Sequence, residues 1–153
     1  MKIKVLLLAA IVPAILSGCG DMHRYAQYVY ENQTGKAIEI AFYDETYYDA
    51  ATGTVNPDAR LFYSFVIAAS ERYYEAAAPV YDSDREAIRN PFENVGGKYV
   101  SVSNGEVVVV QTRPEGLFDQ SNYVRTSEED DLVWLLYVFT DDFFASGIPV
   151  AAE

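Results

Sequence analysis

The two residue types best suited to nucleophilic or metal chemistry occur once each, and both lie close to the amino terminus. Cys19 is the only cysteine and His23 the only histidine of the 153 residues. A Ser-His-Asp relay or a histidine-rich metal site needs its imidazole inside the folded body, whereas His23 follows Cys19 by four residues in a short polar stretch. We therefore expect His23 to be a solvated linker residue, and the sequence predicts no metal and no cofactor.

Cys19 ends the segment Leu16-Ser17-Gly18-Cys19, which resembles the lipobox of bacterial lipoproteins. Before it stand Lys2, Lys4 and an apolar run that is far shorter than the roughly 20 residues of a membrane-spanning helix but typical of a secretory signal peptide. The resemblance implies cleavage between Gly18 and Cys19 and lipid attachment to the Cys19 thiol, where each buried methylene contributes about 0.8 kcal/mol to membrane binding. Thiol catalysis by Cys19 is then excluded. An ordinary secretory signal with a chance cysteine is the less favoured interpretation.

Carboxylates are numerous enough to raise the question of glycoside hydrolysis, which needs two of them about 5–10 Å apart. The candidate groups are Asp44 with Glu45, the acidic run from Glu128 to Asp131, and Asp141 with Asp142. Each group falls at a predicted turn or helix start, where acidic side chains cap backbone amides. The run at 128–131 also lacks the Asp-x-Asp-x-Asp-Gly spacing of a calcium loop. We expect no enzyme activity from these groups.

Paired aromatic residues suggest binding rather than catalysis, because aromatic ring faces stack on sugars. Tyr47 with Tyr48 and Tyr73 with Tyr74 are the candidate ligand-binding residues. Adjacent side chains in a strand point to opposite faces, so one member of each pair is expected in the core. Trp134 lies in the middle of an apolar run, and we expect it to be a core residue as well.

Charge narrows the choice of partners. The chain has a formal net charge of −12, and removing residues 1–18 takes away Lys2 and Lys4 but no acid, so the charge becomes −14. Such a field repels nucleic acid and anionic lipid surfaces and attracts cations or a basic protein patch. The alternative explanation of the acidic composition is that the negative charge only keeps an exported protein soluble.

The elements that must position these residues are predicted to be β-strands, since 13 Tyr and 8 Phe accompany many Val and Ile. Residues 25–31 and 36–43 are expected to form a hairpin around the turn at 32–35, with Ile38, Ile40 and Phe42 on one face. The sequon Asn32-Gln33-Thr34 is interpreted as part of that turn. Further strands are expected at 61–68 and 71–77, after a long connection at 44–60.

The clearest hairpin is predicted around Asn104-Gly105, a pair that tolerates the positive φ angles of a type I′ turn. It joins strands at 98–103 and 106–112, and the valines at 107–110 are expected to be buried on both faces. After a loop at 114–122, a short strand at 123–126 and an acidic turn at 127–131, residues 132–139 form a second central strand. Short helices are expected after Ser83, in a capping box with Glu86, and over 141–145 with Thr140 as the cap.

Three segments together resemble a group of small lipoproteins from Bacteroidetes: Tyr28 to Ile40, Glu106 to Gln111, and the ending Leu136 to Phe143. Proteins of this group open with a strand, an Asn/Thr turn and an Ile-rich strand, and close with an aromatic strand running into Thr-x-Asp-aromatic. The resemblance implies an all-β, immunoglobulin-like β-sandwich of about seven or eight antiparallel strands with one or two short helices. It brings no catalytic residues.

These observations predict a signal peptide over residues 1–18, a lipidated tether over 19–24 and one β-sandwich domain over 25–153. We expect a lipid-anchored component of the bacterial cell envelope, at the outer membrane, that binds a glycan or an envelope protein. Two alternatives are a structural subunit that pairs with a partner through an open edge strand, and a carboxylate-dependent glycan hydrolase.

Overall fold

The computed structural model describes residues 25–80, 88–129 and 132–150. The predicted signal peptide, Gly18, Cys19 and His23 lie outside the described residues, as do the capping box at Ser83 and the end of the acidic run. None of the helical segments in the described residues is long and apolar enough to cross a membrane.

The first sheet, which we call sheet A, is built around the amino-terminal strand. Its order is β10 (Val124–Glu129), β11 (Leu132–Phe139), β1 (Tyr25–Asn32) and β6 (Arg72–Tyr74), and β7 (Ala78–Pro79) also pairs with β1. β1 and β11 run parallel along their whole length, from Tyr25 opposite Leu132 to Asn32 opposite Phe139. The prediction that all strands are antiparallel is therefore wrong for this central pair.

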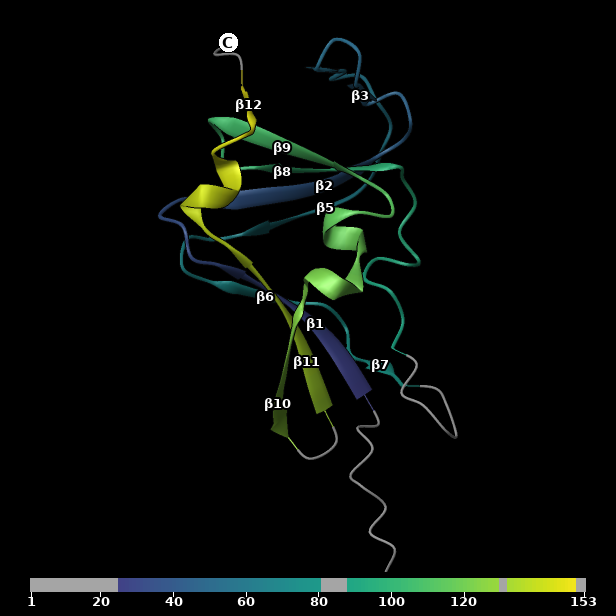
Figure 1. Cartoon of the computed structure of the whole chain (residues 1–153), viewed down its shortest axis with the longest axis vertical. Coiled ribbons are helices and arrows are strands. Elements are labelled where there is room, and N and C mark those ends of the chain that lie inside the picture. The colour runs from purple at the N-terminus through teal and green to yellow at the C-terminus, as the bar shows by residue number, and fades with distance from the viewer. Residues whose placement is uncertain (1–24, 81–87, 130–131, 151–153) are drawn as a thin grey trace, which may run out of the picture.

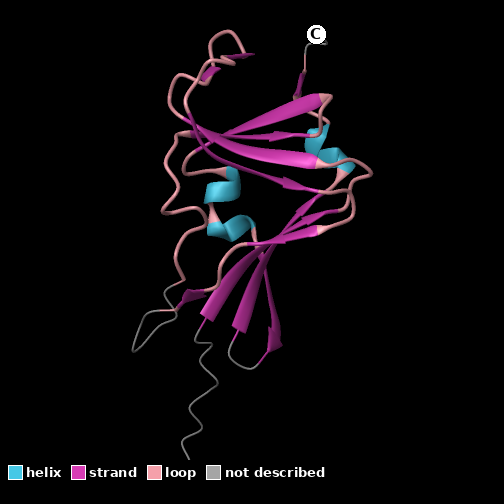
Figure 2. Cartoon of the chain, turned by 180° about the vertical axis from the view of Figure 1, so that it is seen from behind, coloured by secondary structure: helices cyan, strands magenta, loops and turns pink. Residues whose placement is uncertain are grey.

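The second sheet, sheet B, is antiparallel throughout. Its order is β12 (Ile148–Pro149), β9 (Val107–Thr112), β8 (Tyr99–Ser103), β2 (Ile38–Tyr43) and β5 (Leu61–Ile67). Figure 1 shows these strands running across the view while β1, β10 and β11 run down it, so the two sheets cross where they pack. The view from behind in Figure 2 shows the same two layers. The prediction of an all-β fold with two packed sheets is confirmed.

The remaining elements lie in the connections between the strands of sheets A and B. A small hairpin of β3 (Tyr48–Asp49) and β4 (Thr54–Val55) occupies part of the predicted connection at 44–60. The described residues form three 3₁₀ segments: η1 (Gly116–Phe118) and η2 (Gln120–Asn122) within the predicted loop, and η3 (Asp141–Phe144) at the predicted terminal helix. The Thr140 side chain makes no capping hydrogen bond to η3, so that detail of the prediction is wrong.

The core lies between the sheets and is dominated by aromatic rings. In β2 the predicted inner face is confirmed, because Ile38, Ile40 and Phe42 are fully buried; on the other face Glu39 is exposed, but Ala41 is buried as well. The Phe42 ring lies 4.5 Å from the Phe92 ring and 5.7 Å from the Phe118 ring, measured between centroids. Bringing such large apolar surfaces together out of water is the main force that joins the two sheets.

The predicted hairpin of β1 and β2 does not form, because the chain passes from sheet A to sheet B between them. Asn32 holds this corner: its side-chain amide donates hydrogen bonds to the carbonyl oxygens of Lys36 (2.7 Å), Ala68 (3.0 Å) and Ile67 (3.2 Å). Its Oδ1 accepts hydrogen bonds from the backbone N–H and the hydroxyl of Thr34. Asn32 is fully buried and satisfied within the fold, so the sequon at this position is a structural corner.

Three further local predictions need correction. At the Asn104-Gly105 turn only Gly105 has a positive φ, 86°, so the turn is not type I′, and Asn104 Oδ1 instead accepts from the amides of Glu106 and Val107. In β9 only Val108 is buried, since β12 covers just the start of that strand. β10 continues to Glu129, so most of the predicted acidic turn is strand.

Trp134 is also placed differently from the prediction. It lies on the outer face of β11, half-buried, and its ring meets the ring of Tyr74 edge-on at 5.7 Å. The core side of β11 is formed by Val133, Leu135 and Phe139. The apolar run of β11 is explained by its central position, where both faces of the strand are at least partly covered.

Candidate functional site

The four candidate tyrosines lie in two separate places. Tyr47 and Tyr48 are at the β3–β4 hairpin, over the outer face of sheet B, whereas Tyr73 and Tyr74 belong to β6 in sheet A. Tyr73 packs into the core, stacked on Phe65 at 4.1 Å with its hydroxyl 2.8 Å from that of Tyr63, while Tyr74 points outward. The structure therefore does not combine the two pairs into one surface.

Around Tyr47 the hairpin builds a second apolar cluster on the outer face of sheet B. The rings of Tyr43 and Tyr47 stack at 4.0 Å with 5° between their planes, and Tyr48 meets Tyr99 edge-on at 5.9 Å. Tyr47 and Tyr99 are each 7% exposed. This packing fixes the hairpin on the sheet and makes a rigid aromatic wall.

A groove of about 530 Å³ opens between this wall and β12. That volume lies within the range of pockets that bind small molecules, about 300–1,000 Å³. Sheet B forms its floor, the hairpin with the neighbouring Tyr43 forms one wall, and the chain end forms the other. The floor is lined by Glu39, Ser101, Ser103 and Val108. The hairpin wall is lined by Tyr43, Tyr47, Gly53, Thr54, Val55 and Pro57, and the wall at the chain end by Ile148, Pro149 and Val150.

The polar groups of the groove are hydroxyls and one carboxylate. Burial raises the pKa of the Tyr47 phenol, a hydrogen bond from Ser101 partly offsets this rise, and the charge of Glu39 adds to it. Burial is also the largest cause of the raised pKa of Tyr43, and the neighbouring Tyr47 and Glu39 raise it further. Both phenols therefore remain protonated at neutral pH, where they can donate and accept hydrogen bonds. The groove offers an aromatic wall, hydroxyls and one exposed carboxyl group, that of Glu39.

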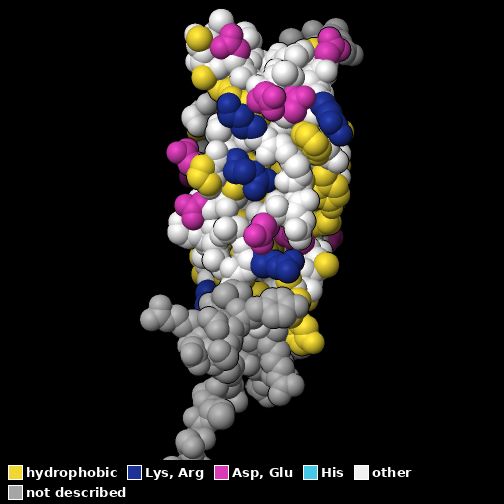
Figure 3. Space-filling view, turned by 90° about the vertical axis from the view of Figure 1, so that its right-hand side faces the viewer, with side chains coloured by type: hydrophobic (Ala, Val, Ile, Leu, Met, Phe, Trp, Pro, Cys, Tyr) yellow, Lys and Arg dark blue, Asp and Glu magenta, His cyan; other side chains and the backbone are white. Residues whose placement is uncertain are grey.

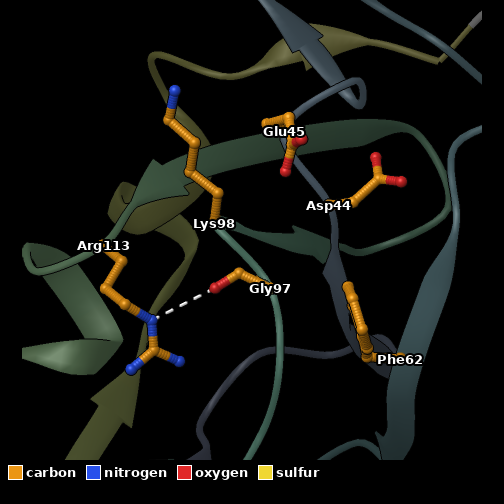
Figure 4. Close-up of a pocket in the computed structure, with 6 residues that line it drawn as sticks. All are labelled: Asp44, Glu45, Phe62, Gly97, Lys98 and Arg113. Carbon is orange, nitrogen blue, oxygen red and sulfur yellow. Dashed lines mark hydrogen bonds between the residues drawn. The ribbon is translucent and has the colours of Figure 1, made fainter.

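A second pocket, of about 380 Å³, combines charges of both signs (Figure 4). Asp44 and Glu45 lie on one side, Lys98 and Arg113 on the other, and Phe62 closes the lower end. The Arg113 guanidinium donates to the carbonyl oxygens of Gly97 at 3.1 Å and Val95 at 3.0 Å, and lies 4.0 Å from the centre of the Phe118 ring. Arg113 therefore holds the 92–97 loop in place and has few donors left for a ligand.

Asp44 is likewise occupied by local structure. Its carboxylate accepts from the backbone N–H of Thr46 at 2.9 Å and from the Thr46 hydroxyl at 2.6 Å, and these bonds lower the pKa of Asp44. This is the turn-capping role expected from the sequence. Within the described ranges 25–80, 88–129 and 132–150, no group of three or more His, Cys, Asp or Glu side chains is placed to hold a metal ion.

Sequence reasoning missed Glu75, a carboxylate held against the core. The Tyr30 hydroxyl donates to Glu75 Oε2 at 3.2 Å. Burial raises the pKa of the Glu75 carboxyl, and this hydrogen bond offsets only part of the rise, so the pKa lies above its usual value. No local pattern marks Glu75, because it directly follows β6 in a stretch of alanines and tyrosines. Its environment arises only when β6 pairs with β1.

The raised pKa of Glu75 predicts a specific pH dependence of stability. A carboxyl whose pKa is higher in the folded than in the unfolded protein stabilises the fold below its unfolded pKa, and this contribution is lost as pH rises through the folded value. We expect Glu75→Gln to raise the free energy of unfolding at pH 7 and to flatten its decline between about pH 4 and 7. Urea unfolding across this pH range measures the effect. A Gln variant less stable than the wild type at pH 7 would contradict it, and Glu71→Gln, at an exposed site, is the control.

Comparisons with protein-family models, curated proteins and solved structures find no match to this chain. The assignment of a function therefore depends on the groove itself.

Proposed function

We propose that this protein is a lipid-anchored lipoprotein of the bacterial cell envelope that binds a glycan, without catalysis, in the groove between the β3–β4 hairpin and β12. The observation that carries the proposal is the rigid Tyr43–Tyr47 wall beside the Glu39 carboxylate and the Ser101 and Ser103 hydroxyls. Sugars present apolar ring faces flanked by hydroxyls, so they match an apolar surface next to a small number of hydrogen-bonding groups.

The number of carboxylates favours binding over hydrolysis. Glycosidases use two acids flanking the scissile bond, whereas Glu39 is the one acid among the groove-lining residues of the described chain. With one carboxylate, a sugar hydroxyl can be held by a charge-assisted hydrogen bond, but no second group is placed to attack the anomeric carbon.

The position of the groove supports display from a membrane tether. β1 begins at Tyr25, six residues after Cys19, at the lower end of the molecule in Figure 1, and the hairpin and β12 lie at the opposite end. Lipid on Cys19, which the lipobox resemblance implies, would leave the groove facing away from the membrane. A position in the outer membrane and membership of the Bacteroidetes lipoprotein group are part of this proposal.

We also propose that the sandwich is immunoglobulin-like. The chain crosses repeatedly between the sheets, from β1 to β2, from β5 to β6, from β7 to β8, from β9 to β10 and from β11 to β12. Such crossings are typical of the Greek-key connections of immunoglobulin-like sandwiches.

Replacement of Glu39 tests the binding proposal. The full-length protein in mild detergent is expected to retain a subset of oligosaccharides on a glycan array, and Glu39→Gln to weaken that binding about tenfold, because a hydrogen bond to a charged group contributes about 1.5–3 kcal/mol. Glu39 is exposed, so the variant should be as stable as the wild type. Glu71→Gln, an exposed acid outside the groove, should bind normally. An array without retained glycans, or equal loss in both variants, would refute the proposal.

A further inference from the structure

The four edges of sheets A and B in the described part of the chain differ in how they are protected. β12 is two residues long and contains Pro149, and η1 and η3 lie against β9 beyond it. β10 carries Arg125, and β6 is three residues long and carries Arg72. Short length, proline and charge are the features by which natural sheets prevent edge-to-edge association. β5 is different.

β5 is a seven-residue edge strand that is uncharged and contains no proline. Its side chains include Leu61, Phe62, Tyr63 and Val66, which are between 38% and 61% exposed. Figure 3 shows a column of apolar side chains down the right-hand side of one face of the molecule, beside Lys, Arg, Asp and Glu side chains. An exposed, apolar edge strand of this length is a template for pairing with another strand.

We propose that β5 pairs antiparallel with β5 of a second copy of this protein, so that sheet B continues across a symmetric dimer. In the register centred on Ser64, Phe62 of each copy faces Val66 of the other, and Tyr63 faces Phe65. A pair of two aromatic residues, or of an aromatic and a β-branched residue, is favourable across neighbouring strands. The strand is thus complementary to itself, as an isologous interface requires.

Charge favours the same contact. The chain carries a net charge of −12, so most surfaces of two copies repel each other, but residues 61–70 contain no charged side chain. Two copies therefore meet at β5 with less electrostatic repulsion than at an acidic surface. Because paired strands keep equivalent faces on one side, both grooves would open on the same side of the continuous sheet.

Sedimentation velocity of the full-length protein in mild detergent tests the dimer. The wild type is expected to form a concentration-dependent dimer, and Val66→Lys to shift it to monomer, because the lysine replaces the apolar partner of Phe62 in both copies of that cross-strand pair. Val124→Lys is the matched control, because Val124 is a valine of equal exposure (62% against 61%) on the edge strand β10. A wild-type monomer at all concentrations, or a dimer that survives Val66→Lys, would overturn the proposal.

Disulfide trapping tests the register. Directly opposed residues of antiparallel strands have Cα atoms about 4.5–5.5 Å apart, within the range that a disulfide bridges. Ser64→Cys should therefore yield a covalent dimer on mild oxidation, and Val124→Cys should not exceed the wild-type background, which includes any dimer formed through Cys19. No excess for Ser64→Cys over the control would exclude the register centred on Ser64.

Discussion

Replacing Asn32 with alanine is expected to lower the free energy of unfolding by about 3–5 kcal/mol, because its fully buried side chain donates to three carbonyl oxygens and accepts two hydrogen bonds from Thr34. The carbonyl oxygens of Lys36, Ile67 and Ala68 would lose a buried donor. These bonds join the end of β1 to the start of β2 and the end of β5, where the chain leaves sheet A for sheet B. Urea unfolding, followed by tyrosine and tryptophan fluorescence, measures the change.

Asn104→Ala is the matched control for this prediction. Asn104 is also a turn asparagine, but it makes two hydrogen bonds in a half-buried hairpin, so its loss should cost about 1 kcal/mol. Asn32→Asp separates geometry from chemistry: it retains the acceptor for Thr34 but cannot donate to three carbonyls, and should destabilise at least as much as alanine. Equal effects of Asn32→Ala and Asn104→Ala would contradict the structural role of the buried corner.

Phe42→Ala is expected to destabilise the fold to a similar extent, by about 3–5 kcal/mol. Phe42 is fully buried on the inner face of β2, and its ring meets those of Phe92, Phe118 and Tyr63, which come from three other segments of the chain. Removing it leaves a cavity at the junction of these segments. Thermal or urea unfolding measures the loss. Tyr25→Ala, which removes an aromatic ring that is 48% exposed, should change stability by less than about 1 kcal/mol.

The parts of the fold that could be predicted from the sequence are those encoded by local patterns. Alternation in Ile38 to Tyr43, the Asn104-Gly105 turn and the apolar run of β11 placed these strands within a few residues. Pairing between distant segments could not be predicted in this way. The parallel contact of β1 with β11 joins residues more than 100 positions apart, and no local signal encodes it. The corner at Asn32 resembled a hairpin turn because both use Asn, Thr and Gly.

The same distinction applies to the candidate site. Tyr47 was identified as a candidate because aromatic pairs are visible in the sequence. Glu39, Ser101 and Ile148 were not, because they meet only through the order β2, β8, β9, β12 across sheet B. Tyr73 and Tyr74 were equally visible, yet Tyr73 is partly buried against the core and Tyr74 lies on the outer face of sheet A.

The groove is tested most directly by nuclear magnetic resonance titration of the isotope-labelled full-length protein, in detergent, with an oligosaccharide retained on the array. We predict that the amide shift changes concentrate on Glu39, Ser101 and Thr54, which line the groove from both sheet and hairpin. Changes centred instead on the outer face of sheet A, around Tyr74 and Trp134, would contradict the placement of the binding site in the groove.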